Sequence, residues 1–324
     1  MTGLVTVFGG SGFVGKPVVR ALTQKGWRVR VAVRKAAEAY DLKPLGDVGQ
    51  VQVVRCDVRV DEDVARALEG ASAVVNLVGI LYETLSLKFE ALHHQASAII
   101  ARLAAERGIT SFVQVSAIGA DAQATSKYLS TKGLGEDAVR AAIPDAVILR
   151  PSVVFGPQDG FLTGLANQAK LFPLLPSIGG GNTQFQPVFV GDVARAVAET
   201  LGHADSLGQT FELGGPEVFS FNDLVRYVGE ETHTPRPLVW TPYSVAGIIG
   251  FVGNIHAGLH GMIPVIPAPL LTTDQVEMLK TDNVVSAQAK GLKDLGIVAT
   301  GLESIAPSYL WRFRKNGQFA EVVG

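Results

Sequence analysis

Short apolar runs and longer amphipathic stretches alternate through the first half of the chain. Residues 4–8 (LVTVF) are a continuous apolar run typical of a buried strand, and a glycine-rich turn leads from them into a helical pattern that reaches residue 26. Apolar residues then alternate with polar ones in residues 27–35 (WRVRVAVRK), which predicts a second strand. Strand, helix and strand in this order predict two parallel strands joined by a crossover helix.

The same order continues beyond this unit. Further strands are predicted at 51–57, 73–79 and 111–116, with a short acidic helix after the first of them and a helix at 88–107. Repeated strand-helix order predicts an α/β fold of the Rossmann type, a doubly wound parallel sheet with helices on both faces.

Two domains are predicted from this pattern. Residues 1–155 are expected to form the nucleotide-binding Rossmann domain, and residues 156–324 a smaller mixed α/β domain on the substrate side. Segments near 186–200 are expected to return to the first domain.

Composition narrows the class of protein. The 324 residues are 47% hydrophobic, enough to fill a core, and a net charge of −2 gives no basic stripe of the kind that nucleic-acid binding needs. The single cysteine, Cys56, excludes an intramolecular disulfide and a multi-cysteine metal site, and we expect it to be a small core residue. The first strand begins so close to Met1 that no signal or transit sequence is expected, which indicates a cytoplasmic protein.

The turn after the first strand carries the glycine spacing of a dinucleotide site. Gly9, Gly12 and Gly15 give GxxGxxG, and Gly10 with the latter two also satisfies GxGxxG. Such glycines let backbone amides approach a pyrophosphate at the start of a helix. The predicted contacts are Gly9, Gly10, Ser11, Gly12, Phe13, Val14 and Gly15.

The end of the second strand distinguishes the two nicotinamide cofactors. Either an acid for a ribose hydroxyl or an arginine for a 2′-phosphate stands there in dinucleotide folds. This chain has Arg34 followed by Lys35, so we expect NADP(H) to be preferred over NAD(H). The alternative is that the two cations only mark a solvated end of the strand. Further cofactor contacts are expected at the adenine edge, under the ribose and beside the nicotinamide: Asp57, Val58, Leu77, Val78, Gly79, Pro151, Val153 and Val154.

Three polar residues are candidates for chemistry. Ser116 ends the fifth strand at the carboxyl edge of the sheet, and Tyr128 and Lys132 lie four residues apart on one face of the next helix. With these residues the chain resembles the atypical extended short-chain dehydrogenases/reductases. The resemblance implies that Ser116 holds a substrate carbonyl and that Tyr128 acts as acid or base. It also implies that Lys132 binds the nicotinamide ribose and lowers the pKa of the tyrosine.

A narrower resemblance rests on longer segments. YLSTKGLGEDAVRAAIPDAVILRPSVVFGPQDGF from residue 128, QPVFVGDVARAV (186–197) and LLTTDQVEML (270–279) are similar to the NADPH-binding accessory subunits of respiratory complex I and their bacterial relatives. This resemblance implies tight NADPH binding, support of an assembly without turnover, and contact with quinone-module subunits. It also implies a peripheral position on the cytoplasmic side of the inner membrane.

Many active relatives have a proton-relaying asparagine near the start of the 88–107 helix, where this chain has His93 and His94. Either histidine could relay protons, or it could be an ordinary, partly exposed residue of the helix; we favour the second interpretation. Asp192 reads as a helix cap without a catalytic role.

The second half is poor in charge. Between Lys170 and Arg195 there is no Lys or Arg, which argues against the pyrophosphate of a sugar-nucleotide substrate. Residues 237–273 contain no charged side chain, and Asn254, His256, His260 and Pro264 interrupt the run, so we expect no transmembrane span. A buried cap, a lipophilic substrate pocket and an exposed surface for a partner or membrane remain as alternatives for this run.

Near the end, TTDQVEML carries a helix-capping pattern, and a final helix is predicted in IAPSYLWRFRKNG. Its Trp311, Arg312, Arg314 and Lys315 could meet an acidic partner or anionic lipid, but a basic helix end usually serves the helix itself.

The sequence thus leads to two hypotheses about function. One is a non-turnover NADPH-binding accessory subunit of complex I. The other is an active NADP-dependent reductase, or an NAD(P)-dependent epimerase/dehydratase, that uses Ser116, Tyr128 and Lys132 on an apolar carbonyl or hydroxyl substrate.

Overall fold

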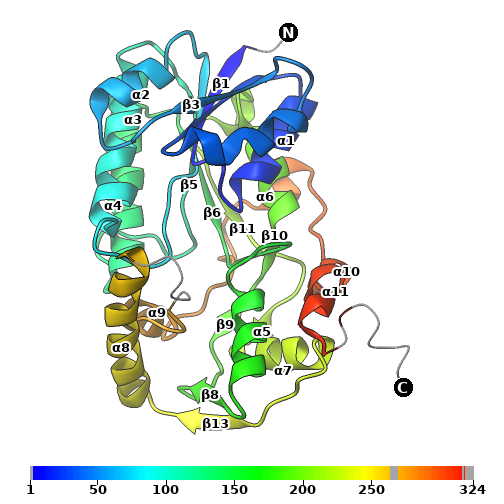
Figure 1. Ribbon diagram of the computed structural model, residues 1–324. Helices are drawn as coiled ribbons and strands as arrows, with labels where there is room; N and C mark the ends of the chain where they lie inside the picture. Colours follow the sequence, from blue (N-terminus) through cyan, green and yellow to red (C-terminus); the bar gives the residue numbers. More distant parts are fainter. Residues whose placement is uncertain (1–2, 263–268, 316, 318–324) are drawn as a thin grey trace.

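A seven-stranded parallel sheet forms the centre of the larger half of the molecule (Figure 1). The computed structural model describes residues 3–262, 269–315 and 317. The order across the sheet is β3-β2-β1-β4-β5-β6-β11, and all neighbouring pairs are parallel. The strands are β1 (Leu4–Phe8), β2 (Arg28–Val33), β3 (Val51–Arg55), β4 (Ala73–Asn76), β5 (Ser111–Val115), β6 (Val147–Pro151) and β11 (Thr210–Leu213). The predicted Rossmann-type α/β fold is confirmed.

The order of the strands reverses direction between β1 and β4. From β1 the chain moves outward to β2 and β3, and it then returns to the other side of β1 to build β4, β5 and β6. The loops that follow β1 and β4 therefore lie next to each other at the carboxyl edge, at the switch point where ligands of open α/β sheets bind.

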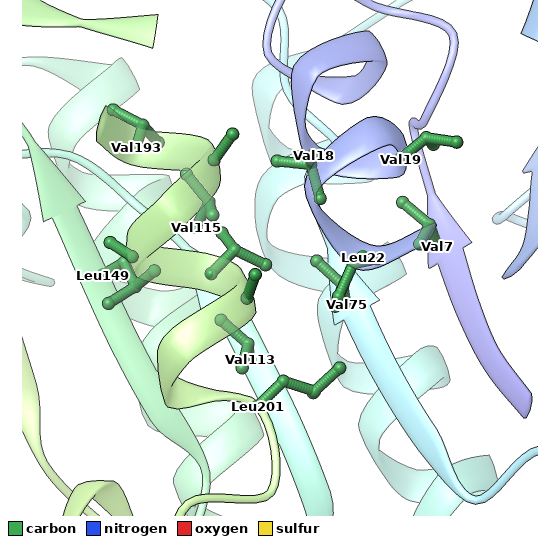
Figure 2. Close-up of a cluster of buried hydrophobic side chains, with 14 of the residues drawn as sticks. Val7, Val18, Val19, Leu22, Val75, Val113, Val115, Leu149, Val193 and Leu201 are labelled. Atoms are coloured by element: carbon green, nitrogen blue, oxygen red, sulfur yellow. The ribbon is translucent and has the colours of Figure 1, made fainter. Parts of the chain in front are cut away.

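Helices cover both faces of this sheet. One face carries α1 (Gly15–Gln24) and α6 (Val190–Thr200), and Figure 2 shows Val18 and Leu22 of α1 and Val193 of α6 among the valines of the strands. Val18, Val19 and Leu22 recur at helical spacing, so α1 turns one apolar side to the sheet. The opposite face carries α2 (Asp61–Ala67), α3 (Ala96–Ala105) and α4 (Lys127–Ala142). Cys56 is buried there, as predicted, and burial raises the pKa of its thiol to about 12.

Several predicted elements end earlier or are subdivided. β3 ends at Arg55 and β4 at Asn76, so Asp57 and residues 77–79 lie in the loops that follow the strands. The helix predicted at 88–107 starts with a π-helical stretch, η2 (Glu90–Gln95), which continues into α3. Such stretches interrupt the regular backbone ladder and often occur beside functional sites.

The smaller half lies below the sheet in Figure 1. Its short strands pair as β7 (Val154–Phe155) with β10 (Val188–Phe189), β8 (Leu175–Ile178) with β13 (Leu238–Thr241), and β9 (Gln184–Phe185) with β12 (Phe219–Ser220). Its helices are α5 (Leu162–Leu171), α7 (Phe221–Glu231), α8 (Tyr243–Met262), α9 (Thr273–Met278), α10 (Leu302–Ile305) and α11 (Pro307–Leu310). Phe155, Leu162, Leu224 and Leu310 are among the residues of its separate core. Within the described residues of both halves, the 3-10 helices are η1 (Ala36–Leu45), η3 (Ala204–Ser206), η4 (Leu292–Leu295) and η5 (Trp311–Phe313).

One prediction about a helix end is wrong, and one is confirmed in part. Asp192 is not the cap of α6, which begins at Val190; its buried carboxylate accepts hydrogen bonds from the Thr300 amide (2.6 Å) and hydroxyl (3.0 Å) and pairs with Arg195. It therefore anchors the segment before α10. The predicted C-terminal helix is confirmed in part: α10, α11 and η5 follow one another, with Ala306 between the first two in the helical region, and the Arg314 guanidinium beyond them donates to the Glu231 carbonyl oxygen (2.7 Å).

Candidate nucleotide and catalytic site

The loop between β1 and α1 is shaped by two glycines. Gly9 has φ +79°, in the left-handed region that favours glycine, and a Cβ on Gly15 would lie 2.5 Å from the Gly10 carbonyl. The first turn of α1 therefore packs directly on the loop, while Ser11 and Gly12 are exposed. This backbone can approach a phosphate at the helix N-terminus, so the loop fits the pyrophosphate of a dinucleotide.

The two cations at the end of β2 have different surroundings. Both Arg34 and Lys35 are exposed, but the Lys35 ammonium is paired with Glu38 (2.8 Å). Beside them, the Asp57 carboxylate accepts hydrogen bonds from the Arg59 guanidinium (2.7 and 2.9 Å). These bonds are the main cause that lowers the pKa of Asp57, and the charge of Arg34 contributes. Sequence reasoning missed Arg59, which stands only two residues from the predicted adenine contact.

A buried amide fixes the loop after β4. The Asn76 side chain donates to Gln114 Oε1 (2.9 Å) and Ser97 Oγ (3.1 Å), and its oxygen accepts from the Val78 amide (3.1 Å). Leu77 and Val78 are half-buried and Gly79 is exposed. The predicted ribose floor is thus a fixed and accessible loop.

Ser116 follows β5 directly and has an unsatisfied hydroxyl. Its side chain is 4% exposed, and among the described residues its Oγ has no hydrogen-bond partner. Most buried polar atoms in proteins have a partner, so this oxygen is suited to a ligand group that enters the site.

Tyr128 and Lys132 lie in the first turns of α4. Lys132 is 5% exposed, and its ammonium donates to the Val115 carbonyl (3.3 Å), next to Ser116, at 6.0 Å from the centroid of the Tyr128 ring. Burial lowers the pKa of Lys132 to about 8. Burial of the phenol and the nearby Asp274 carboxylate raise the pKa of Tyr128 to about 12. The expectation that Lys132 lowers the tyrosine's pKa is therefore wrong for this arrangement, and the phenol stays protonated at neutral pH.

His93 is not the partly exposed helix residue that was expected. It is 1% exposed; Nε2 accepts from the Ile80 amide (3.1 Å), so the proton belongs on Nδ1, which faces Thr131 Oγ1 (3.1 Å). Burial and the charge of Lys132 lower the pKa of His93 to about 2. Both ring nitrogens are occupied, so His93 holds the loop after Gly79 against α4. His94 is paired with Glu90 (2.7 Å).

Residues distant in the sequence complete the site. The Asp274 carboxylate of α9 accepts from the Ser126 hydroxyl and from the Lys127 and Tyr128 amides (2.7–3.1 Å). The Asn283 side chain accepts from the Ser152 hydroxyl (2.7 Å) and the Val153 amide (2.9 Å), which fixes the segment expected beside the nicotinamide. The capping pattern of TTDQVEML is confirmed for α9 itself, but nothing in it signalled the contact with α4.

The uncharged run at 237–273 exposes large apolar side chains. Among the α8 residues whose side chains are described (243–258), the buried positions are small, Ala246, Gly250, Gly253 and Ala257, so the interpretation as a buried cap fails for this part of the helix. The outer face, termed the α8 face here, consists of Val245, Ile248, Ile249, Phe251, Val252 and Ile255, which are 44–68% exposed. Pro264 lies outside the described residues, and in the part of the chain that is described no helix meets the length and hydropathy of a membrane span.

Comparison with known proteins places the chain in a family. The model of the NAD dependent epimerase/dehydratase family matches residues 5–214. A relative from Arabidopsis thaliana, "NADH dehydrogenase [ubiquinone] 1 alpha subcomplex subunit 9, mitochondrial", is 35% identical over 98% of this chain and 80% of its own length. "Ceramide reductase" from Caulobacter vibrioides is 34% identical over 54% of this chain and 53% of its own.

A solved structure has the same fold. The NADPH-dependent quinone oxidoreductase QOR2 from Escherichia coli, determined with NADPH, matches with a TM-score of 0.73 and 16% identity over 95% of this chain and 99% of its own. The resemblance to extended short-chain dehydrogenases/reductases is thus confirmed, and the chain belongs to the NAD dependent epimerase/dehydratase family.

Proposed function

We propose that this chain is an NADP(H)-binding accessory subunit of respiratory complex I that holds its nucleotide without turning over a substrate. The similarity to the Arabidopsis complex I subunit over nearly the whole chain carries the proposal. An enzyme of this family that shared only the nucleotide-binding half would not be expected to match at 98% coverage.

The nucleotide would bind across the switch point of the sheet. The loop at 9–15 would hold the pyrophosphate, Arg34 the 2′-phosphate and Lys132 the nicotinamide ribose, and a bound NADPH supplies a hydride donor. Arg34 is exposed and forms no ion pair with an acid among the described residues, unlike Lys35, which pairs with Glu38; this supports NADP(H) over NAD(H).

The α8 face would dock on quinone-module subunits at the cytoplasmic side of the membrane. Six large apolar side chains in one helix, without a charge in 237–273, form the kind of contiguous surface that marks an interaction site. A peripheral position then requires no membrane span.

Native purification tests this function. In mild detergent, the tagged chain is expected to migrate with complex I subunits identified by mass spectrometry. Migration as an isolated protein under conditions that keep complex I intact would exclude the accessory role.

The alternative is an active NADP-dependent reductase of an apolar substrate. It is favoured by the unpartnered Ser116 hydroxyl, by a Tyr128 phenol that stays protonated and can donate its proton, and by the partial similarity to a ceramide reductase. Tyr128→Phe removes that proton. Oxidation of NADPH with long-chain carbonyl compounds that falls by several orders of magnitude in this variant would establish the alternative, whereas no oxidation by either protein supports the accessory role.

A further inference from the structure

The helix that carries Tyr128 and Lys132 is held at its N-terminus by a residue from the other half of the chain. One Asp274 oxygen accepts from the Lys127 amide (2.7 Å), and the other from the Ser126 hydroxyl (2.9 Å) and the Tyr128 amide (3.1 Å). Tyr128 and Asp274 are 146 residues apart. The first amides of a helix have no partner within it, so this carboxylate satisfies two of them and places a negative charge at the positive end of α4.

The helix also has a cap of its own. Ser126 Oγ accepts from the Leu129 amide (3.2 Å). The Ser126 hydroxyl therefore accepts a hydrogen bond from α4 and donates one to Asp274. The first turn of α4 is held both by its own cap and by Asp274. A displacement of α9 would remove partners from the amides of Lys127 and Tyr128 and from the Ser126 hydroxyl.

α9 is in turn locked to α8. A Cβ on Gly253 would overlap the Leu271 carbonyl oxygen, and a Cβ on Gly250 would lie 2.8 Å from the Thr272 carbonyl carbon, so the segment before α9 runs against the backbone of α8. The side-chain amide of Asn254 donates a hydrogen bond to Thr273 Oγ1 (2.7 Å). In Figure 1, α8 and α9 lie together below the lower end of α4.

We propose that Asp274 is a positioning residue that couples the Tyr128–Lys132 end of the nucleotide site to the α8–α9 unit. This proposal rests on the proposed function in that the bound ligand is a nicotinamide nucleotide. A nucleotide that orders the first turns of α4 also orders the amides and the hydroxyl that donate to Asp274. Because Asp274 belongs to α9, and α9 packs on α8, both helices are stabilised in turn. Because coupling between sites is reciprocal, a partner seated on the α8 face tightens nucleotide binding by the same factor.

The charge of Asp274 has a second consequence at the site. It raises the pKa of Tyr128 beyond the effect of burial, so the phenol is kept as a hydrogen-bond donor.

Hydrogen exchange of the full-length chain tests the coupling. Asp274→Asn keeps the size of the side chain but removes its charge. The matched control is Asp223→Asn, because Asp223 accepts from the Ser220 amide (3.1 Å) and hydroxyl (2.6 Å) at the start of α7. In the wild type and in Asp223→Asn, saturating NADPH is expected to slow exchange in residues 126–132 and also in 271–279.

In Asp274→Asn, NADPH is expected to protect only residues 126–132, and its dissociation constant to rise about three- to thirtyfold, the size of a lost helix cap. Equal affinity together with full protection of 271–279 in this variant would overturn the proposal. If the wild type binds no NADP(H), the proposed function fails. The positioning role is then tested by hydrogen exchange of the proteins without nucleotide. Asp274→Asn must then exchange faster than Asp223→Asn at 126–131, and equal rates would refute the role.

Discussion

At the scale of single residues, Arg34 and Lys35 are adjacent cations that differ in their availability to bind a phosphate. Lys35 is already paired with Glu38, whereas Arg34 stands exposed at the end of β2 beside Asp57. Arginine also binds phosphate with two parallel hydrogen bonds, which an ammonium cannot do. Arg34 is therefore the residue that should distinguish the two nicotinamide cofactors.

Arg34→Ala is expected to weaken NADPH binding about ten- to hundredfold and to leave NADH binding nearly unchanged, because only NADPH has the 2′-phosphate. Lys35→Ala is the matched control and should change the NADPH affinity little. Fluorescence titration of both cofactors measures this. Tighter binding of NADH than of NADPH by the wild type would contradict the assignment.

His93 should make stability depend on pH. Its pKa is lowered to about 2 in the folded chain, so below about pH 6.5 only the unfolded state takes up a proton there. The free energy of unfolding should therefore fall as the pH drops below 6.5, by about 1.4 kcal/mol per pH unit from this residue.

His93→Gln removes the titrating group and keeps a donor and an acceptor. Urea unfolding between pH 6.5 and 5 is expected to show a shallower loss of stability in this variant than in the wild type. His203 is exposed, so His203→Gln is the control and should retain the wild-type slope. Identical slopes in all three proteins would show that His93 is not held neutral.

Candidate site residues could be placed from the sequence where their position is local. Gly9, Arg34 and Ser116 follow directly after strands, and the order of strands and helices brings such positions to one edge of the sheet. Asp274 and Asn283 could not be found in this way, because their contacts with α4 and with Ser152–Val153 span more than a hundred residues. The burial of His93 depends on the packing of α4 against η2, which no local pattern encodes.

At the scale of elements, α8 shows why composition could not separate core from surface. The helix is apolar on nearly every side, so periodicity does not indicate which side is buried. The structure buries the small residues: Gly250 and Gly253 permit the close approach of residues 271–273, and Ala246 and Ala257 are also buried. The large side chains are left outside as the α8 face.

Two glycines of α8 make a matched pair. A Cβ on Gly247 would meet nothing within 4 Å, so Gly247→Ala should stabilise the chain by about 0.5–1 kcal/mol through helix propensity. Gly253→Ala should destabilise it by about 1–3 kcal/mol, because the methyl group displaces Leu271. Chemical denaturation distinguishes the two, and equal stabilities would contradict the packing of α8 on the segment before α9.

At the scale of the whole molecule, the chain presents a nucleotide site at the sheet edge and an apolar helix face on the smaller half. These two features are linked through α9 and α4. The parallel sheet with helices on both faces followed from the order of the segments, whereas the strand order and the seventh strand, β11, were not predicted. The division into domains at residue 155 stays a prediction, although β11 joins the large sheet and α6 packs beside α1 on it.

We propose that NADP(H) enters complex I bound to this chain, which docks there through the α8 face. The direct measurement is the NADP(H) content of native complex I purified through a tag on this chain, for the wild type and for Ile248→Asp. Val298→Asp is the control, because Val298 is exposed (83%) and lies outside α8, whereas Ile248 is 68% exposed within the α8 face.

Complexes of the wild type and of Val298→Asp are expected to contain NADP(H) equimolar with the tagged chain, and the nucleotide should still be bound after turnover with NADH. Ile248→Asp should be recovered as free chain with its nucleotide. Complex I that contains the wild-type chain but no NADP(H) would exclude the role of this chain as a nucleotide carrier, and complex I that retains Ile248→Asp at the wild-type level would exclude docking through the α8 face.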